Sequence, residues 1–351
     1  MEERVYKYQV CIRCFTYNHS QYIISALNGF AMQITDFPYL IMLVDDASTD
    51  GAKDIIAKYV QEYFDLSNKG SKVLETNDAN IVYAQHKTNK NCFILVHYLK
   101  YNHYKKKKKL PYLQKWRDES RYEALCEGDD YWIDSGKLQK QVDFLVTHPE
   151  YSMCFHDVYR VSNNVMLEPY RQYASNTEVL VEDVILNGGL FCPTASIVYR
   201  HELLVDYPDF ARKCHVGDYP LQIFLALKGK IYFFVDVMGC YRVGAPGSWT
   251  ESMSKADRAT RLAKMDNEVE MLESYDLYSG RKYTHAFTSR INHYKLLTYM
   301  DLRDKTGVKK YYPLVSNIDT RNKIRCFLIV HNLLFFIKIY RYIKRLCTTT
   351  I

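Results

Sequence analysis

The chain has 351 residues, of which 48% are hydrophobic and 25% are charged, so it is long and apolar enough to bury a large core. This composition excludes an intrinsically disordered protein. Lys and Arg outnumber Asp and Glu by 47 to 40, and the net charge of +7 favours anionic partners such as nucleotides, phosphates or an anionic membrane surface. The excess of positive charge is too small to indicate nucleic-acid binding.

The N-terminal sequence MEERVYKYQV is charged and lacks the apolar run of a secretion signal. Together with ten cysteines spread along the chain, it indicates a reduced, cytoplasmic protein without disulfides. Cys11 and Cys14 form a C-x-x-C pair inside a strand-like run, with no second Cys or His pair at zinc spacing, so we interpret them as buried thiols. The sequence contains no apolar run of 18 residues that would predict a membrane span.

The first part of the chain alternates between strand and helix patterns, which predicts a parallel α/β sheet. We expect strands at 9–15, 39–44, 72–74 and 121–126, and helices at 21–32, 52–64, 92–104 and 135–147. The five adjacent lysines at 105–109 repel one another and predict an exposed loop.

The second half of the chain continues with strands and then becomes helical and charged. We expect strands at 153–161, 192–199 and 231–237 and a helix that begins near Asp218. The predicted domains are an α/β domain at 1–249, a helical region at 250–320 and a basic amphipathic segment at 321–351.

Acidic residues occur where an α/β sheet places its ligand sites, at the carboxyl ends of strands. Asp45 and Asp46 follow one predicted strand, Glu127, Asp129 and Asp130 follow another, and Asp218 begins a helix. Carboxylates at such positions are also common as helix caps, so the recurrence indicates a site more strongly than any single residue does.

The segment Glu127-Gly128-Asp129 spaces two carboxylates so that both can point toward one hard cation. Mg²⁺ or Mn²⁺ readily takes one or two carboxylates together with substrate phosphates, which suits a nucleotide-diphosphate donor. Gly128 would leave room for the diphosphate to approach the backbone. A capped turn with solvated acids is the alternative, but the adjacent Tyr131 and Trp132 favour a site.

Four short motifs occur in a fixed order along the chain. They are VCIRCFTYN at 10–18, VDDASTDG at 44–51, CEGDDYW at 126–132 and KLQKQ at 137–141. Over residues 8 to about 250 the sequence resembles family 2 glycosyltransferases of the GT-A fold, close to bacterial members that build surface polysaccharides. The resemblance implies a Rossmann-like mixed sheet flanked by helices. It also implies an inverting, metal-dependent hexosyltransferase that moves a sugar from a nucleotide diphosphate, preferably a uridine one, to a glycan or lipid-linked acceptor.

The resemblance also implies roles for individual residues. The donor nucleotide and its diphosphate would be bound by Thr16, Tyr17, Asn18, Asp45, Asp46, Ser48, Gly128 and Arg242. Asp129 is the expected ligand of Mg²⁺ or Mn²⁺, and Glu127, which stands where the family has the first Asp of D-x-D, is the weaker one. Asp130, Trp132 and Trp249 would face the sugar or the acceptor, and Asp218 is the expected general base, with a helix-capping acid as its alternative.

Two departures from the family pattern concern the donor site. Many members continue the segment Tyr241-Arg242-Val243 with a His near the metal, whereas this chain continues with GAPGSWT. A third protein ligand is therefore missing there, and Arg242 or the glycine-rich backbone is expected to meet the phosphate charge instead. Residues 87–91 lack an Arg that some members place near the nucleotide, and Lys87 and Lys90 are candidate substitutes.

Residues 324–346 carry bulky apolar side chains among five Lys or Arg. A core helix and a partner-binding helix are possible, but the pattern fits a helix lying in a headgroup layer. We therefore expect a peripheral protein at the inner face of the cell membrane that acts on a polyprenyl-linked acceptor.

Two other functions were weighed against the glycosyltransferase. A non-catalytic nucleotide-sugar-binding module could retain the pocket, as the missing His suggests. A dinucleotide-dependent oxidoreductase is disfavoured because no G-x-G-x-x-G follows the first strand.

Overall fold

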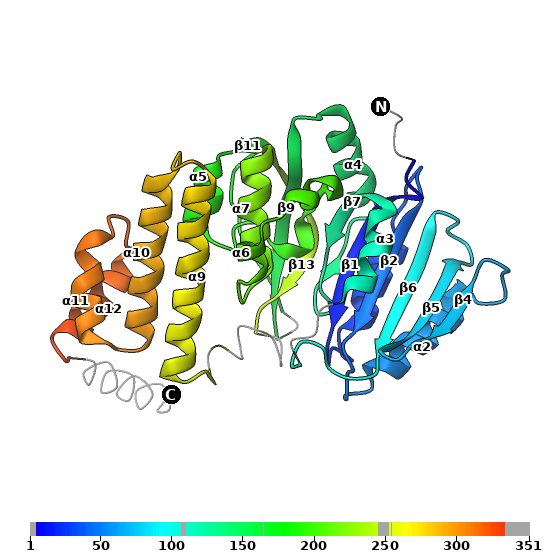
Figure 1. The fold of residues 1–351 in the computed structure, drawn as a ribbon, viewed down its shortest axis with the longest axis horizontal. Coiled ribbons are helices and arrows are strands. Elements are labelled where there is room, and N and C mark those ends of the chain that lie inside the picture. The colour runs from blue at the N-terminus through cyan, green and yellow to red at the C-terminus, as the bar shows by residue number, and fades with distance from the viewer. Residues whose placement is uncertain (1–4, 107–109, 164, 245–252, 254, 334–351) are drawn as a thin grey trace, which may run out of the picture. The chain divides into compact units, whose positions relative to one another are not determined.

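The computed structural model describes residues 5–106, 110–163, 165–244, 253 and 255–333. The chain divides into two compact units (Figure 1). The first comprises Met1–Val184, Gly189–Pro208 and Leu221–Ser252, and the second comprises Ile185–Gly188, Asp209–Pro220 and Met253–Ile351. The second unit thus includes two short segments that the sequence assigned to the α/β domain.

Within the described residues, a mixed sheet of 13 strands organises the first unit. The strands are β1 (Tyr8–Thr16), β2 (Tyr39–Asp45), β3 (Phe64–Asp65), β4 (Lys72–Glu75), β5 (Ala79–His86), β6 (Cys92–Leu99), β7 (Ser120–Leu125), β8 (Tyr131–Trp132), β9 (Tyr151–Ser162), β10 (Val165–Leu167), β11 (Thr177–Val179), β12 (Val198–Arg200) and β13 (Lys230–Arg242). The main order is β11-β13-β9-β12-β7-β1-β2-β6-β5-β3. The central strands β7, β1, β2 and β6 are parallel, as predicted for β1 and β2, while β12 and β5 are antiparallel to their neighbours.

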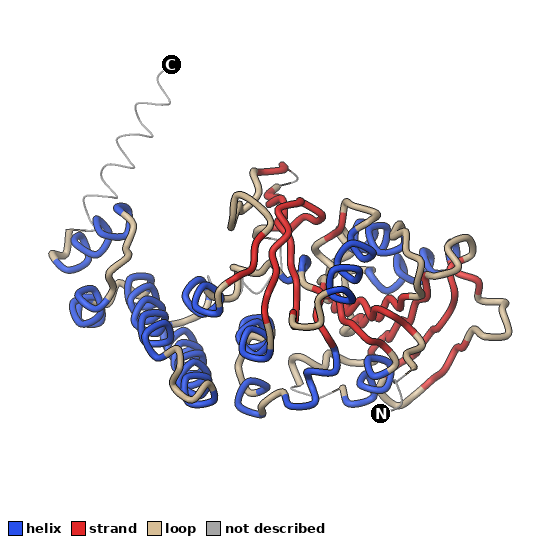
Figure 2. Tube along the Cα trace, turned by 90° about the horizontal axis from the view of Figure 1, so that it is seen from above, coloured by secondary structure: helices blue, strands red, loops and turns tan. Residues whose placement is uncertain are grey.

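Helices cover both faces of this sheet (Figures 1 and 2). In the described part of the chain the α-helices are α1 (Ile23–Ala31), α2 (Ala52–Tyr63), α3 (Gln114–Asp118), α4 (Lys137–Thr147), α5 (Val181–Asn187), α6 (Asp209–Arg212), α7 (Asp218–Lys228), α9 (Arg258–Tyr278), α10 (Thr284–Asp301), α11 (Lys305–Tyr311) and α12 (Thr320–Val330). Phe30 of α1, Ile56 of α2 and Leu138 of α4 pack on one face, and Trp116 of α3 packs on the other. Short 3₁₀ turns occur at Pro111–Leu113, Thr194–Ser196, His201–Asp206 and Tyr312–Leu314.

The helix predicted at 92–104 is wrong, because Cys92–Leu99 forms the strand β6. This strand lies between β2 and β5 and is buried along most of its length, so its residues are apolar without the alternation of a one-sided strand. The strand predicted at 192–199 is also shortened. A 3₁₀ turn at Thr194–Ser196 precedes it, and only Val198–Arg200 pairs in the sheet.

The structure confirms that the two cysteines of the C-x-x-C pair are buried thiols. Cys11 and Cys14 are fully buried in β1, and they contribute to different hydrophobic clusters on the two faces of the sheet. Residues three apart in a strand point to opposite faces, so these two thiols cannot share a ligand.

The second unit is helical. Its helices α9 and α10 lie side by side (Figure 1), and a small core joins α10, α11 and α12. The members of this core are Leu296, Met300, Val308, Tyr311, Cys326 and Ile329. No helix in the described part of the chain is long and apolar enough to cross a membrane.

The helix predicted at 324–346 is interrupted in its described part. Helix α12 ends at Val330, the N–H of Leu333 donates to the carbonyl of Leu328 (2.8 Å), and Asn332 has a φ of +55°. This pattern closes a helix C-terminus. Residues from 334 onward, which carry the remainder of the predicted helix, lie outside the described residues.

A buried ionic network stabilises the first unit around Glu123 of β7. The Glu123 carboxylate is fully buried and accepts hydrogen bonds from Nε of Arg117 (2.9 Å), the Tyr199 hydroxyl (2.7 Å) and Nδ1 of His201. A second guanidinium nitrogen of Arg117 forms an ion pair with it at 2.8 Å. Burial alone would raise the pKa of Glu123, but the charge of Arg117 and the bond from His201 hold this pKa well below its usual range.

We expect Glu123→Gln to lower the free energy of unfolding by about 3 kcal/mol at pH 7, because it leaves the largely buried Arg117 without its counter-charge. The stabilisation by Glu123 is present above its ordinary pKa of 4.5 and is lost as the pH falls toward the depressed pKa, so the difference between variant and wild type should shrink in acid. Urea unfolding measures both effects, with exposed Glu202→Gln as the control. A loss below about 1 kcal/mol at pH 7 would contradict this role.

Candidate functional site

The carboxyl ends of β1, β2 and β7 meet at one edge of the sheet. Thr16 pairs with Asp45 at the ends of β1 and β2, and Arg13 of β1 pairs with Leu125 at the end of β7. Beyond β7 the chain continues along β1, because the N–H of Gly128 donates to the carbonyl of Phe15 (3.0 Å). The register therefore brings the predicted donor-site segments together at this edge.

Hydrogen bonds tie the loops after β1 and β2 to each other. Asn18, whose φ is +56°, donates its N–H to Oγ of Ser48 (2.9 Å), and the Ser48 hydroxyl donates to the carboxylate of Asp45. The N–H of Ser20 donates to Oδ2 of Asp50 (2.8 Å). These bonds place Asn18, Asp45 and Ser48 in one cluster, as the sequence predicted, and fix the backbone between residues 18 and 20.

Asp46 anchors the segment that follows β6. Its two carboxylate oxygens accept the backbone N–H groups of His103 (2.6 Å) and Tyr104 (3.1 Å). From this segment, Lys105 reaches back to β1 and donates to the hydroxyl of Tyr17 (3.1 Å). The first two residues of the lysine run thus lie in an exposed turn, as predicted, and one of them contacts a predicted nucleotide-site residue.

The acidic motif after β7 combines exposed and buried carboxylates. Glu127 is exposed, whereas Asp129 and Asp130 are 8% and 3% exposed. Arg242 of β13 binds both buried residues: its N–H donates to Oδ1 of Asp130 (2.8 Å), and its guanidinium donates to the carbonyl of Asp129. Burial and the neighbouring charge of Asp129 raise the pKa of Asp130 well above its usual range.

The Arg242 guanidinium lies between two aromatic rings. Its central carbon is 4.6 Å from the ring centre of Tyr22 and 4.5 Å from that of Tyr131. Its Nε is buried and has no hydrogen-bond partner among the described residues. The rings thus hold a positive charge beside the acidic motif.

Gly128 is required by the close packing of two polar side chains. A Cβ at this position would lie 2.6 Å from Oγ1 of Thr16 and 3.1 Å from Nδ1 of His19. The space that we expected Gly128 to leave for a diphosphate is thus taken up by Thr16 and His19. Nε2 of His19 lies 4.0 Å from Oδ2 of Asp129, so an imidazole that the sequence analysis did not identify belongs to the site.

The expectation that Trp132 faces the sugar or acceptor is corrected by the structure. Trp132 is 2% exposed, packs edge-on against Phe30 and donates its indole N–H to the carbonyl of Ala195 (2.7 Å). Lys137, which is fully buried, has its ammonium 4.0 Å from the Trp132 ring centre and donates to Gln141 (2.7 Å). Burial lowers the pKa of Lys137 to about 7. The KLQKQ motif thus supports the acidic motif from inside the core.

The other predicted site residues have different positions. Asp218 is the first residue of α7, belongs to the second unit and accepts the N–H of Tyr219 (2.8 Å) on its carboxylate. Lys87 donates to the carbonyls of Gln61 (2.9 Å) and Glu62 (2.7 Å) near the end of α2, which explains its presence without a nucleotide. Trp249 lies outside the described residues.

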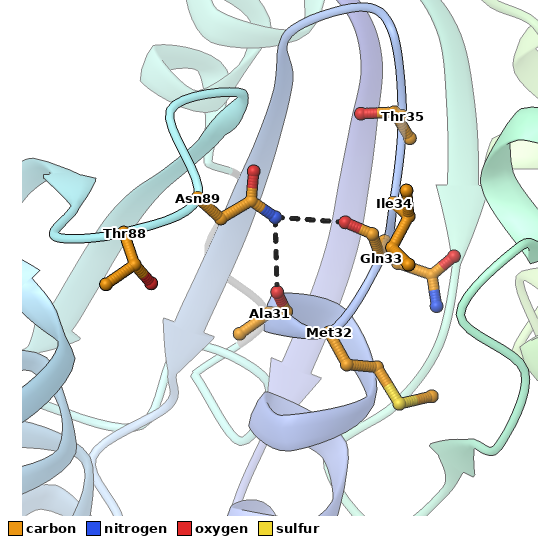
Figure 3. A pocket seen from close by; sticks show the side chains of 7 residues that line it. All are labelled: Ala31, Met32, Gln33, Ile34, Thr35, Thr88 and Asn89. Carbon is orange, nitrogen blue, oxygen red and sulfur yellow. Dashed lines mark hydrogen bonds between the residues drawn. The ribbon is translucent and has the colours of Figure 1, made fainter.

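A surface hollow lies at the opposite edge of the sheet, near the amino ends of β2 and β6. Asn89 lines this hollow, and its side-chain amide donates to the carbonyls of Ala31 (3.3 Å) and Gln33 (2.9 Å) (Figure 3). The residues that line it are Ala31, Met32, Gln33, Ile34, Thr35, Thr88 and Asn89, and none of them is a predicted site residue.

A divalent cation fits this site only together with a substrate. In the described part of the chain, no group of three His, Cys, Asp or Glu side chains could hold a metal ion by itself. Mg²⁺ and Mn²⁺ sites commonly use one or two protein ligands plus phosphate oxygens and water. The buried Asp129 carboxylate, with the His19 imidazole 4.0 Å away, meets that smaller requirement.

Comparison with known proteins shows where the likeness lies. Residues 12–79 match the family model described as glycosyl transferase family 2. An uncharacterized protein of Mycobacterium tuberculosis is 33% identical over 234 residues, which make up 67% of this chain and 58% of that protein. A Mycoplasma pneumoniae protein named as an uncharacterized glycosyltransferase is 26% identical over 199 residues, which make up 56% of this chain and 55% of that protein. The chain thus spans less than two thirds of the length of these relatives.

A solved structure shares the architecture. The mannosyltransferase from Pyrobaculum calidifontis in complex with GDP-Man and Mn²⁺ has a TM-score of 0.50 and 12% identity, covering 94% of this chain and 88% of that chain. With the mixed sheet flanked by helices, this likeness shows the GT-A fold that the sequence motifs predicted. The match to glycosyl transferase family 2 covers the first two strands of this fold.

Proposed function

We propose that this protein is an inverting, metal-dependent glycosyltransferase that moves a sugar from a nucleotide diphosphate to a glycan or lipid-linked acceptor. One observation carries the proposal: Arg242 and the buried Asp129 adjoin at the carboxyl edge of a sheet whose first strands match glycosyl transferase family 2. A positive charge and a carboxylate side by side suit a diphosphate bridged by a cation.

The nucleotide would occupy the cluster at the ends of β1 and β2. Tyr17, Asp45 and Ser48 offer an aromatic ring, a carboxylate and a hydroxyl to a base and ribose, and Asp46 shapes the adjoining loop. We propose a uridine nucleotide as the preferred donor. Arg242 would bind the diphosphate through its remaining donors, held in place by Tyr22 and Tyr131.

Asp129 would hold the cation, with Glu127 as a second, exposed carboxylate, and Asp130 would contact the sugar. A bound Mg²⁺ or Mn²⁺ would neutralise charge that develops on the leaving diphosphate. Asp218 would accept the proton of the acceptor hydroxyl while its oxygen bonds to the anomeric carbon and the bond to the diphosphate breaks. Attack opposite the leaving group inverts the configuration.

A thermal-shift screen with nucleotides and nucleotide sugars tests the donor without knowledge of the acceptor. A uridine or guanosine diphosphate sugar should raise the melting temperature in a concentration-dependent way, because a ligand that binds only the folded state stabilises it. Added Mn²⁺ should enlarge the shift. If no nucleotide changes the melting temperature with or without Mn²⁺, the proposed donor class is wrong.

A non-catalytic nucleotide-sugar-binding module is the second candidate. The absence of a His after Val243 in the sequence favours it, because this position supplies a metal ligand in the family that the chain resembles. A binding module of this kind should show a thermal shift with the donor but neither hydrolysis nor transfer at any acceptor or metal concentration.

We also propose that the enzyme acts at the inner face of the cell membrane in surface polysaccharide synthesis, on a polyprenyl-linked acceptor. The basic and apolar residues at 334–346 support this proposal by their composition. Removing residues 334–351 should lower co-sedimentation with anionic vesicles at least about tenfold, since each basic residue near such a surface contributes about 1 kcal/mol. Neutral vesicles are the control, and unchanged co-sedimentation of the truncated chain with anionic vesicles would refute this role.

A further inference from the structure

The imidazole of His19 lies at the acidic motif, and no hydrogen bond from this ring to another described residue explains its position. Its side chain is 11% exposed, and Nδ1 is buried without a partner among the described residues. Nε2 lies 4.0 Å from Oδ2 of Asp129, too far for a hydrogen bond. A largely buried ring with an unpartnered nitrogen costs free energy, so its place beside Asp129 indicates a role other than packing.

Hydrogen bonds hold the backbone of His19 and of the residues before and after it. The N–H groups of its neighbours Asn18 and Ser20 donate to Ser48 and Asp50 of the β2 loop (2.9 and 2.8 Å). The carbonyl of His19 itself accepts the N–H of Tyr22 (2.9 Å) at the start of α1. The direction of the imidazole is thus set before any ligand binds, as a ligating side chain requires.

We infer that His19 ligates the divalent cation of the donor site together with Asp129. Asp129 and His19 would each supply one ligand, and the donor phosphates and water would complete the coordination of the cation. The His19 ring can lie this close to the acidic motif only because Gly128 has no side chain. A Cβ at Gly128 would lie 3.1 Å from Nδ1 of His19. His19 thereby supplies the nitrogen ligand that the segment after Val243 lacks. The inference rests on the proposed function, because it assigns a ligand of the same cation.

Electron paramagnetic resonance of Mn²⁺ tests this assignment without a turnover assay. Mn²⁺ would be titrated into the wild-type chain with UDP or GDP, and pulsed spectra of the complex would be searched for nitrogen coupling from an imidazole. The variants are His19→Ala and His19→Gln, with the exposed His285→Ala as the matched control. The wild type should show the coupling, and both His19 variants should lose it and bind Mn²⁺ at least about tenfold more weakly.

The outcomes separate this inference from the function on which it rests. Wild-type Mn²⁺ binding without nitrogen coupling, or unchanged affinity in both His19 variants, overturns the ligand role even if the protein transfers sugar. If the wild type does not bind Mn²⁺, both the ligand role of His19 and the proposed metal dependence of the enzyme are wrong. His19→Gln retains an amide of similar length, so a thermal melting temperature near that of the wild type shows that a loss of affinity is not a loss of fold.

Discussion

Asp129→Asn should reduce Mn²⁺-dependent sugar transfer by at least about 1,000-fold, because it removes the charged ligand expected to hold the cation against the diphosphate. The amide has the same shape as the carboxylate, and it relieves the repulsion that raises the pKa of the adjacent Asp130. The variant should therefore fold at least as stably as the wild type. Release of nucleoside diphosphate from the donor sugar measures the activity, and thermal melting measures the stability.

The exposed Asp143→Asn serves as the matched control for this substitution, since it removes one carboxylate at a distance from the motif in sequence and structure. It should leave transfer unchanged. Activity of Asp129→Asn within tenfold of the wild type would show that this carboxylate holds no essential cation.

Asp218→Asn should lower transfer about 100- to 10,000-fold while leaving donor affinity unchanged, as expected for the loss of a general base. The helix-capping alternative predicts a different result, because Asp218 is also the first residue of α7 and accepts the N–H of Tyr219. A cap acts on stability, so its loss would lower the melting temperature without a comparable loss of rate.

Initial rates at saturating donor, donor dissociation constants and melting temperatures separate these two roles. The exposed Asp209→Asn at the start of α6 is the control for a lost carboxylate at a helix start. Near-normal rates in Asp218→Asn would remove this residue from the mechanism, and the base would have to be sought elsewhere.

The helices α1 and α2 were predictable because the burial of their residues follows the helical period. The spacing of Ile23, Leu27 and Phe30 marks α1, and the turn before Ala52 marks the start of α2. The strand β6 was not predictable in this way. It is buried between two neighbours, and a continuous apolar run of this length fits a strand or a helix equally well.

The acidic motif follows a strand as predicted, but the directions of its side chains required the structure. In the two-residue strand β8, Tyr131 contacts Arg242 while Trp132 points into the core, because adjacent residues of a strand face opposite sides. Position next to two acids made both rings look like ligand contacts. Only the side of the sheet that each ring faces distinguishes Tyr131 from Trp132.

His19 was missed because the sequence analysis sought a metal-ligating His only near Val243. A possible signal was its place beside Asn18, in the loop after the first strand, where ligand sites of α/β sheets occur. Its proximity to Asp129 depends on pairing between strands that are about a hundred residues apart in the chain. A second long-range pairing, between β13 and β8, brings Arg242 to the motif, and no local pattern encodes either pairing.

Release of nucleoside diphosphate from a donor sugar tests most directly whether the chain turns over a nucleotide sugar at the site formed by Asp129 and Arg242. Wild-type protein would be incubated with a panel of uridine and guanosine diphosphate sugars with and without Mn²⁺, and release of nucleoside diphosphate would be measured. We predict Mn²⁺-dependent release from at least one donor that Asp129→Asn does not support. Donor binding without release from any sugar, in the presence of Mn²⁺ and candidate lipid-linked acceptors, would contradict the claim and establish a binding module instead.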